Sequence, residues 1–228
     1  MASAELLARS DGFRRLRERI LDLAEPRPAH TVVDVGSGTG LLSLELAERA
    51  RQVWAIDSSR AMGEYLRVKA ASAGLCNIEI VLASAVSLPL VDGVADVVVS
   101  NYCMHELCDA DKLQAIAEAK RVLKPGGRLV IGDMMFSLRT LDARDRRVVL
   151  GKLRLLAGRG LPGLWRVAKN AARLAAGRWE HPADADWWRA ALAQVGFEQV
   201  EIELLEHEGG IAAARAPAAD RRGVATAR

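Results

Sequence analysis

VVDVGSGTG, residues 32–40, is the stretch that decides the fold of this chain. A β-branched run leads directly into three alternating glycines, as where a buried strand turns tightly into a helix. Such turns hold the phosphates or the nucleoside of a ligand. The spacing G-x-G-x-G differs from the G-x-G-x-x-G of dinucleotide-binding loops, and no Gly-Lys-Ser/Thr follows, which excludes the phosphate-binding loop of nucleoside triphosphatases.

Two carboxylates indicate the charge of the ligand. Asp34 lies two positions before the first glycine, where it would repel a pyrophosphate and attract an ammonium or sulfonium group, directly or through water. Asp57 ends the next β-branched run, 21 residues after Gly36. An acid at the end of a second strand accepts hydrogen bonds from ribose hydroxyls. Together they predict a nucleoside that carries positive charge, and they disfavour an NAD-dependent oxidoreductase.

Strand and helix patterns alternate through residue 134, which predicts a parallel sheet covered on both faces. Ser59 is the expected cap of one helix and Gly74 its stop. The expected helices are 5–24, 41–50, 59–73 and 110–123, and the expected strands are 31–35, 52–56, 77–83, 95–100 and 128–134, with KPGG (124–127) as a sharp turn. A helix at 185–196 then precedes an antiparallel hairpin of 197–206 and 209–216, with Gly209-Gly210 as its connection.

Four stretches in this order resemble the motifs of class I S-adenosylmethionine-dependent methyltransferases: VVDVGSGTG, AIDSS (55–59), LPLVDGVADVVVSNYCMHEL (88–107) and LKPGGRLVIGD (123–133). The resemblance covers residues 28–134 and the final hairpin. It implies an α/β fold, the Rossmann-like seven-stranded methyltransferase sandwich, whose parallel sheet ends in an antiparallel hairpin. It also implies S-adenosyl-L-methionine as cofactor and S-adenosyl-L-homocysteine as product.

The resemblance also assigns cofactor-binding residues. Asp34, Gly36 and Gly38 would line the methionine end of the cofactor, and Asp57 would hold the ribose. The rest of the implied set comprises Ser37 and Gly40 in the loop, Ser58 and Met62 near the adenine, Ser84 and Ala85 after the third strand, and Asn101 at the methionine moiety or the substrate. The family often has Gly-Asp-Ala where this chain has Ala-Ser-Ala at 83–85, so the neutral Ser84 replaces a carboxylate and is a weaker acceptor for the adenine amino group.

His105 and Glu106 are the expected general bases, because they follow the fourth strand at the edge of the sheet where ligands bind. A role for His105 in packing or in orienting the substrate stays open. Cys103, His105 and Cys108 do not have a zinc-site spacing, and no metal is expected. Tyr102 follows Asn101 without the prolines that clamp a nucleic-acid base, so nucleic acid is a disfavoured partner and Tyr102 is a predicted substrate residue.

Residues 139–178 form a basic segment with 11 Lys/Arg and 2 Asp/Glu, whereas the rest of the chain is acidic. It is expected to form two amphipathic helices, of which the second has Trp165 and a basic face of Arg166, Lys169 and Arg173. One interpretation is that these helices form a lid over the substrate. The alternative is a surface that contacts an anionic membrane or lipid.

The expected organisation is an N-terminal helix (1–28), a cofactor-binding core (29–134), a basic helical lid (135–185), a closing helix and hairpin (186–216) and a tail (217–228). Three cysteines without a disulfide spacing and no signal-peptide pattern favour the cytoplasm. Peripheral contact with the inner face of the membrane is the alternative location. The pattern does not predict an oligomeric state.

The sequence therefore predicts an enzyme that transfers a methyl group from S-adenosylmethionine to a small organic acceptor, in metabolism or natural-product tailoring. A lipid head-group methyltransferase is the first alternative, and a non-catalytic cofactor-binding scaffold is the second. The pattern does not distinguish methylation at oxygen, nitrogen or carbon.

Overall fold

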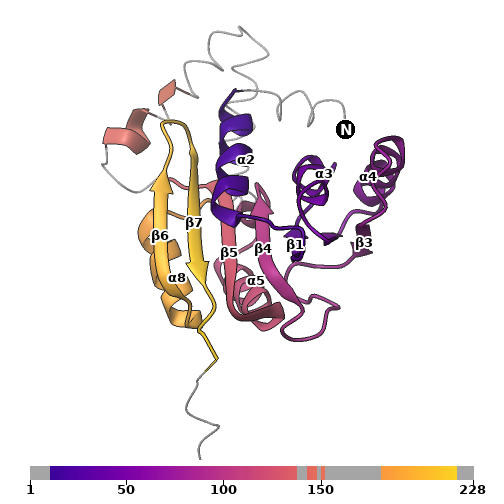
Figure 1. Ribbon diagram of the computed structural model, residues 1–228. Helices are drawn as coiled ribbons and strands as arrows, with labels where there is room; N and C mark the ends of the chain where they lie inside the picture. The colour runs from indigo at the N-terminus through magenta and orange to yellow at the C-terminus, as the bar shows by residue number, and fades with distance from the viewer. Residues whose placement is uncertain (1–10, 138–142, 148–149, 152–180, 220–228) are drawn as a thin grey trace, which may run out of the picture.

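The structure is a computed structural model that describes residues 11–137, 143–147, 150–151 and 181–219. Its seven strands form one sheet in the order β3-β2-β1-β4-β5-β7-β6 (Figure 1). The strands are β1 (Thr31–Val35), β2 (Gln52–Asp57), β3 (Ile78–Leu82), β4 (Ala95–Asn101), β5 (Leu123–Met134), β6 (Glu198–Leu204) and β7 (Gly209–Arg215). The first five strands pair in parallel, and β7 is antiparallel to both β5 and β6. The predicted sheet with an antiparallel end is confirmed.

Helices cover both faces of the sheet (Figure 1). They are α2 (Asp11–Ala24), α3 (Leu41–Ala47), α4 (Arg60–Ser72), the short 3₁₀ helix η1 (Met104–Glu106), α5 (Asp109–Val122) and α8 (Ala185–Val195). The central strands β1 and β4 are largely apolar because they are buried on both sides, whereas β3 and β6 at the edges of the sheet are partly exposed. Ser59 caps α4 by accepting a hydrogen bond from the amide of Met62, as its position before the helix predicts.

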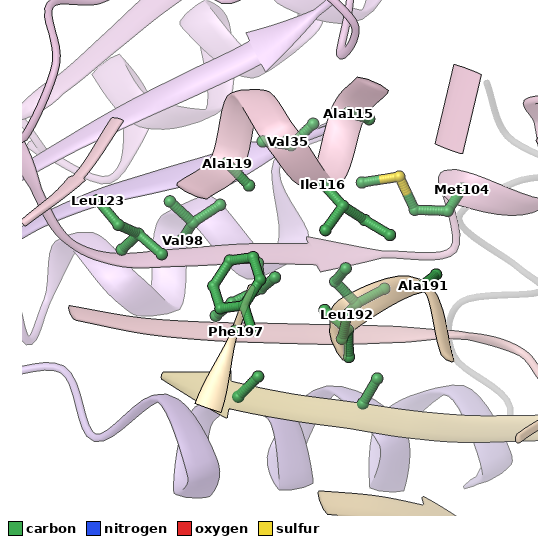
Figure 2. Packing of buried hydrophobic residues seen from close by; sticks show 14 of the residues in the cluster. Val35, Val98, Met104, Ala115, Ile116, Ala119, Leu123, Ala191, Leu192 and Phe197 are labelled. Carbon is green, nitrogen blue, oxygen red and sulfur yellow. The ribbon is translucent and has the colours of Figure 1, made fainter. Parts of the chain in front are cut away.

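The hydrophobic core has two parts, one on each face of the sheet. On one face, buried side chains of α2 and α3 pack on Val32, Val97 and Val99. On the other face, α5 and α8 pack on the alternate residues of the same strands (Figure 2), among them Val33, Val35 and Val98. Alternation along each strand thus assigns consecutive valines to opposite cores.

Helix α2 packs very closely on β5. A Cβ atom at Gly132 would lie 2.5 Å from Cδ1 of Ile20, so the glycine lets the helix side chains touch the strand backbone. Ile20 is fully buried. This contact fixes the start of α2 above the ends of β4 and β5, which matters for the site described below.

Two predicted features differ in the structure, and others lie outside the described residues. KPGG (124–127) is part of β5. The pairing of β5 with β4 shifts register beside Ala95, and Gly126 has a positive φ of 73°. Gly209 and Gly210 begin β7 and are not the hairpin connection, since both pair with β5 and the chain turns at 205–208. Helix α2 is described from Asp11, and most of the basic segment lies outside the described residues, including Trp165, Arg166, Lys169 and Arg173.

Within the described ranges, none of the helices has the length and apolar character needed to cross a bilayer.

Replacing Ile116 by alanine is expected to lower the free energy of unfolding by about 3 kcal/mol, because Ile116 is fully buried between α5 and the sheet (Figure 2). Urea denaturation followed by circular dichroism measures this change. Val68→Ala is the control, since Val68 is 65% exposed on α4 and its truncation is expected to change stability by less than about 0.5 kcal/mol. Equal effects of the two substitutions would contradict this description of the core.

Candidate functional site

The glycine loop connects β1 to α3 and is held onto the neighbouring strand. The amides of Gly36 and Ser37 both donate to the carbonyl of Ile56, at 2.8 and 2.9 Å. Gly40, at a φ of 78°, caps α3. These bonds give the loop one conformation at the carboxyl edge of the sheet, the edge where ligands bind in such folds.

Neighbouring side chains require glycine at two loop positions. A Cβ atom at Gly36 would lie 2.3 Å from Sγ of Cys103, and one at Gly40 would lie 2.1 Å from Cδ1 of Leu66. Both residues also have positive φ angles, which side chains disfavour. The loop is therefore packed against η1 on one side and α4 on the other, with no room for larger residues.

Asp57 connects the loop to the second strand. One carboxylate oxygen accepts from the amide of Gly38 at 2.7 Å, and the other accepts from the amide of Ser59 at 2.8 Å. The carboxylate is half-buried. Each oxygen has a second lone pair, so Asp57 can also accept hydrogen bonds from a diol next to the loop.

Asp34 is buried beneath the loop, with 1% of its surface exposed. Its carboxylate accepts a short hydrogen bond from the hydroxyl of Ser43 on α3. The pKa of Asp34 is raised to about 7, first by burial and to a smaller extent by the charge of Asp57. The hydrogen bond from Ser43 opposes this shift. Among the described residues, no cation is paired with Asp34, so a positive ligand group is the natural partner for its ionised form.

The predicted adenine side of the site is less complete. Ser58 and Met62 lie next to Asp57, at the end of β2 and the start of α4. Ser84 is exposed beyond β3, and its hydroxyl faces the amide of Val86 in its own turn at 3.4 Å. Ala85 is partly buried against the core.

The chain takes an unusual path where β4 ends. Tyr102 has a φ of 52°, which is a strained conformation for a residue with a side chain. Buried oxygens of Ser37, Asn101 and Tyr102 have no hydrogen-bond partner within the described part of the chain. Buried polar atoms without partners are rare in folded proteins. A polar ligand bound between the glycine loop and the end of β4 would satisfy the oxygens of Ser37 and Asn101, so these two residues fit a bound nucleoside and its amino-acid portion.

His105 is paired with a buried carboxylate. Its Nδ1 lies 2.6 Å from Oδ1 of Asp133, and its backbone amide donates to the other oxygen at 2.9 Å. Asp133, on β5, is 1% exposed. Since Asp133 accepts from Nδ1–H, Nε2 is the ring nitrogen that can accept a proton. The sequence motifs singled out His105 but did not identify Asp133 as its partner.

The surroundings of Cys103 show that the edge of the sheet is acidic. The pKa of the Cys103 thiol is raised to about 12, first by burial and then by the charges of four carboxylates, in the order Asp133, Glu106, Asp57 and Asp34. Glu106 itself is exposed. A concentration of negative charge at this edge favours a cationic ligand over a pyrophosphate.

Two aromatic residues from outside the predicted core, Phe13 and His207, lie near Tyr102 and the hairpin turn. Phe13, on α2, stacks on Tyr102 with ring centroids 4.3 Å apart, and Tyr102 meets the edge of His105 at 6.1 Å. His207, before β7, accepts from the amide of Gly209 and lies 3.0 Å from the carbonyl of Gly12. Sequence reasoning missed Phe13 and His207, because their roles depend on contacts between the two ends of the chain.

Within the described ranges, no group of three or more His, Cys, Asp or Glu residues is arranged to hold a metal ion.

Comparison with known proteins identifies similar chains. The model of a methyltransferase domain family matches residues 32–127. The chain is 30% identical over 214 residues to the ubiquinone/menaquinone biosynthesis C-methyltransferase UbiE of Vibrio vulnificus, covering 90% of this chain and 77% of that protein. It is 38% identical over 119 residues to the demethylmenaquinone methyltransferase of Thermus thermophilus, covering 51% of this chain and 53% of the relative.

A solved structure has the same fold. The geranyl diphosphate C-methyltransferase of Streptomyces coelicolor superposes with a TM-score of 0.67 over 89% of this chain and 77% of its own, at 13% identity. The matches to three other curated relatives cover 41% to 60% of the length of those proteins.

Proposed function

The chain belongs to the class I S-adenosylmethionine-dependent methyltransferases, a family of enzymes, and on that premise we propose that it methylates a small organic acceptor. The observation that carries the proposal is the glycine loop bonded to Asp57 beside buried, unpartnered oxygens and an acidic edge. S-Adenosylmethionine is the proposed methyl donor, and S-adenosylhomocysteine is the product.

We assign the cofactor to the loop and to the ends of β1, β2 and β4. Asp57 would accept hydrogen bonds from the ribose hydroxyls. Ser37 and Asn101 would bind the polar groups of the methionine portion, which accounts for their unpartnered oxygens. Ser58, Met62, Ser84 and Ala85 would border the adenine. Bound there, the cofactor supplies a methyl group whose sulfur leaving group is already activated by its positive charge.

His105 is the proposed general base. Its pairing with Asp133 holds the imidazole in one tautomer and orients Nε2. A base at this position takes the proton of an acceptor hydroxyl and so raises the electron density on the oxygen and on the ring carbon beside it. Glu106 is a less suitable base, because it is exposed and only His105 has a buried orienting partner.

We propose a hydroxylated aromatic ring as the acceptor and one of its carbons as the methylated atom. The stacked pair of Phe13 and Tyr102 beside His105 offers a flat apolar wall for such a ring. Two relatives named as quinone methyltransferases, one of them a C-methyltransferase across 90% of this chain, support the same class. Membrane or lipid contact through residues 139–178 has no specific support from the described residues.

Calorimetry and a labelled transfer assay test the proposal. The full chain is titrated with S-adenosylhomocysteine, and it is then incubated with methyl-labelled S-adenosylmethionine and a panel of hydroquinones and phenols. Binding with label in a ring carbon supports the proposal. Binding without transfer to any acceptor would favour a scaffold, label in vesicle lipids would favour the head-group alternative, and no binding at about 1 mM would refute the cofactor assignment.

Cofactor affinity is expected to depend on pH through Asp34. Below a pH of about 7 the carboxyl is mostly protonated, so binding a cation above it requires proton release and becomes weaker. S-Adenosylmethionine is expected to bind about tenfold more weakly at pH 6 than at pH 8. Calorimetry at both pH values measures the difference. In Asp34→Asn the affinity should no longer change with pH, and a pH-dependence equal to that of the unmodified chain would contradict the assignment.

A further inference from the structure

A polar cavity lies at the opposite edge of the sheet from the glycine loop. Its volume is about 250 Å³. It is bordered by the connection between α2 and β1, the first residues of β4 and β5, and the last residue of β7. These are the amino ends of the parallel strands, so the cavity is separate from the proposed methyl-transfer site.

The cavity has an excess of positive charge. The carboxylate of Asp96 neutralises the charge of Lys124, whose Nζ lies 2.7 Å from its Oδ1. The same carboxylate also accepts a hydrogen bond from the amide of Thr31. That leaves three arginines, Arg27, Arg128 and Arg215, around the single carboxylate of Glu25. The hydrogen bond and charge of Arg128 lower the pKa of Glu25, and the charges of Arg27 and Arg215 lower it further, so all three guanidinium groups act on one carboxylate.

Main-chain carbonyls hold two of the arginines in place, whereas the Glu25 carboxylate is hydrogen-bonded to the Arg128 side chain. Arg128 donates to the carbonyl of Leu23 at 2.6 Å, and Arg215 donates to that of Gly126 at 3.3 Å. Glu25 has a side chain that is 53% exposed and a strained φ of 44°. Exposed ion pairs contribute little to stability, so Glu25 can leave the cluster at small cost. The Nδ1 atom of His30, which lines the same cavity, is buried without a partner among the described residues.

We propose that this cavity binds a small phosphate-bearing anion, which takes the place of the Glu25 carboxylate between the three arginines. Guanidinium groups match the geometry of phosphate oxygens, and several converging on one anion make charge-assisted hydrogen bonds. His30 can supply one more donor from Nδ1. The same chemistry serves free phosphate and the phosphate of an organic molecule. The cavity volume admits a phosphate with a small organic group attached.

Titration of the full chain with inorganic phosphate and with ribose 5-phosphate tests this proposal. Isothermal calorimetry is run at constant ionic strength, with sodium chloride replacing the ligand salt. Arg27→Gln combined with Arg215→Gln is expected to weaken binding about tenfold or more. The matched control is Arg67→Gln combined with Arg189→Gln, which removes two exposed arginines on α4 and α8 and is expected to leave the affinity unchanged.

Glu25→Gln separates binding from structural effects. Because it removes the competing carboxylate without removing a donor, it should bind phosphate more tightly than the unmodified chain. Thermal melts by circular dichroism verify that each variant is folded. Tighter binding of ribose 5-phosphate than of inorganic phosphate would identify an organic phosphate as the ligand, and the reverse would identify the free ion. No binding at about 10 mM, or equal affinity in the arginine variants, would overturn the proposal.

Discussion

Replacing His105 by asparagine is expected to lower kcat by about 10²- to 10⁴-fold, the usual contribution of a general base. The asparagine amide can still donate to Asp133, so the loop between β4 and α5 should keep its position. Affinity for S-adenosylhomocysteine is expected to stay within about twofold of the unmodified chain, because His105 is assigned to the acceptor and not to the cofactor. Initial rates with labelled methyl donor and calorimetry measure the two quantities.

Two further variants make this result interpretable. Asp133→Asn, a change at a positioning residue, is also expected to lower kcat, because the amide no longer fixes which ring nitrogen carries the proton. Glu106→Gln should keep nearly full activity, since its carboxylate is exposed and has no orienting partner in the described structure. If His105→Asn kept its kcat and only KM rose, His105 would be a substrate-orienting residue, which the sequence also allows.

Gly36→Ala is expected to reduce affinity for S-adenosylhomocysteine by about 100-fold or more, corresponding to roughly 3 kcal/mol of strain and loop displacement. The new methyl group would lie 2.3 Å from Sγ of Cys103, and the φ of 73° disfavours any side chain. The loop must move, and its amides then lose their bonds to the carbonyl of Ile56. Calorimetry of the purified variant measures the loss.

Gly74→Ala is the matched control for backbone strain. Gly74 has a similar φ of 69°, but a Cβ atom there would meet nothing within 4 Å. This variant should lose some stability and keep its affinity for the nucleoside. Cys103→Gly, added to Gly36→Ala, removes the clashing atoms and is expected to restore part of the affinity. Unchanged binding in Gly36→Ala alone would contradict the close packing of the loop on η1.

Local patterns were enough to predict the sheet and the cofactor loop. The β-branched run before Gly36, the acid at position 57 and the cap at Ser59 each act within a few residues of chain, so sequence reveals them directly. The antiparallel hairpin was likewise predicted from two short strand patterns that lie close together, and the resemblance to the methyltransferase family agrees with its place at the end of the sheet. KPGG and Gly209-Gly210 were misassigned because glycine and proline usually mark turns. Here KPGG lies within β5 at a register shift between Leu123 and Arg128, and Gly209 and Gly210 pair with Met134 and Asp133 of the same strand.

Contacts between distant residues could not be predicted in this way. His105 meets Asp133 because β4 and β5 pair in parallel with Asn101 opposite Gly132, a register that no local pattern encodes. Likewise, Phe13 reaches Tyr102 only because α2 crosses the sheet over Gly132. The burial of Asp34 beneath its own loop also depends on how α3 packs. The sequence identified this carboxylate but not its raised pKa or its bond to Ser43.

The contact between His207 and Gly12 joins the hairpin turn to the start of α2, so we expect the proposed acceptor region to be exchangeable separately from the proposed donor region. The proposed donor residues lie in one continuous stretch of the interior sequence, whereas the aromatic wall depends on α2 and the hairpin turn is held to its start by His207. Chimaeras that swap residues before β1 or after α8 should therefore alter acceptor preference while they retain the methyl donor. We expect substitutions before β1 and after α8 to give this fold new methyl acceptors. A library randomised at Phe13 and His207 is where directed evolution should begin.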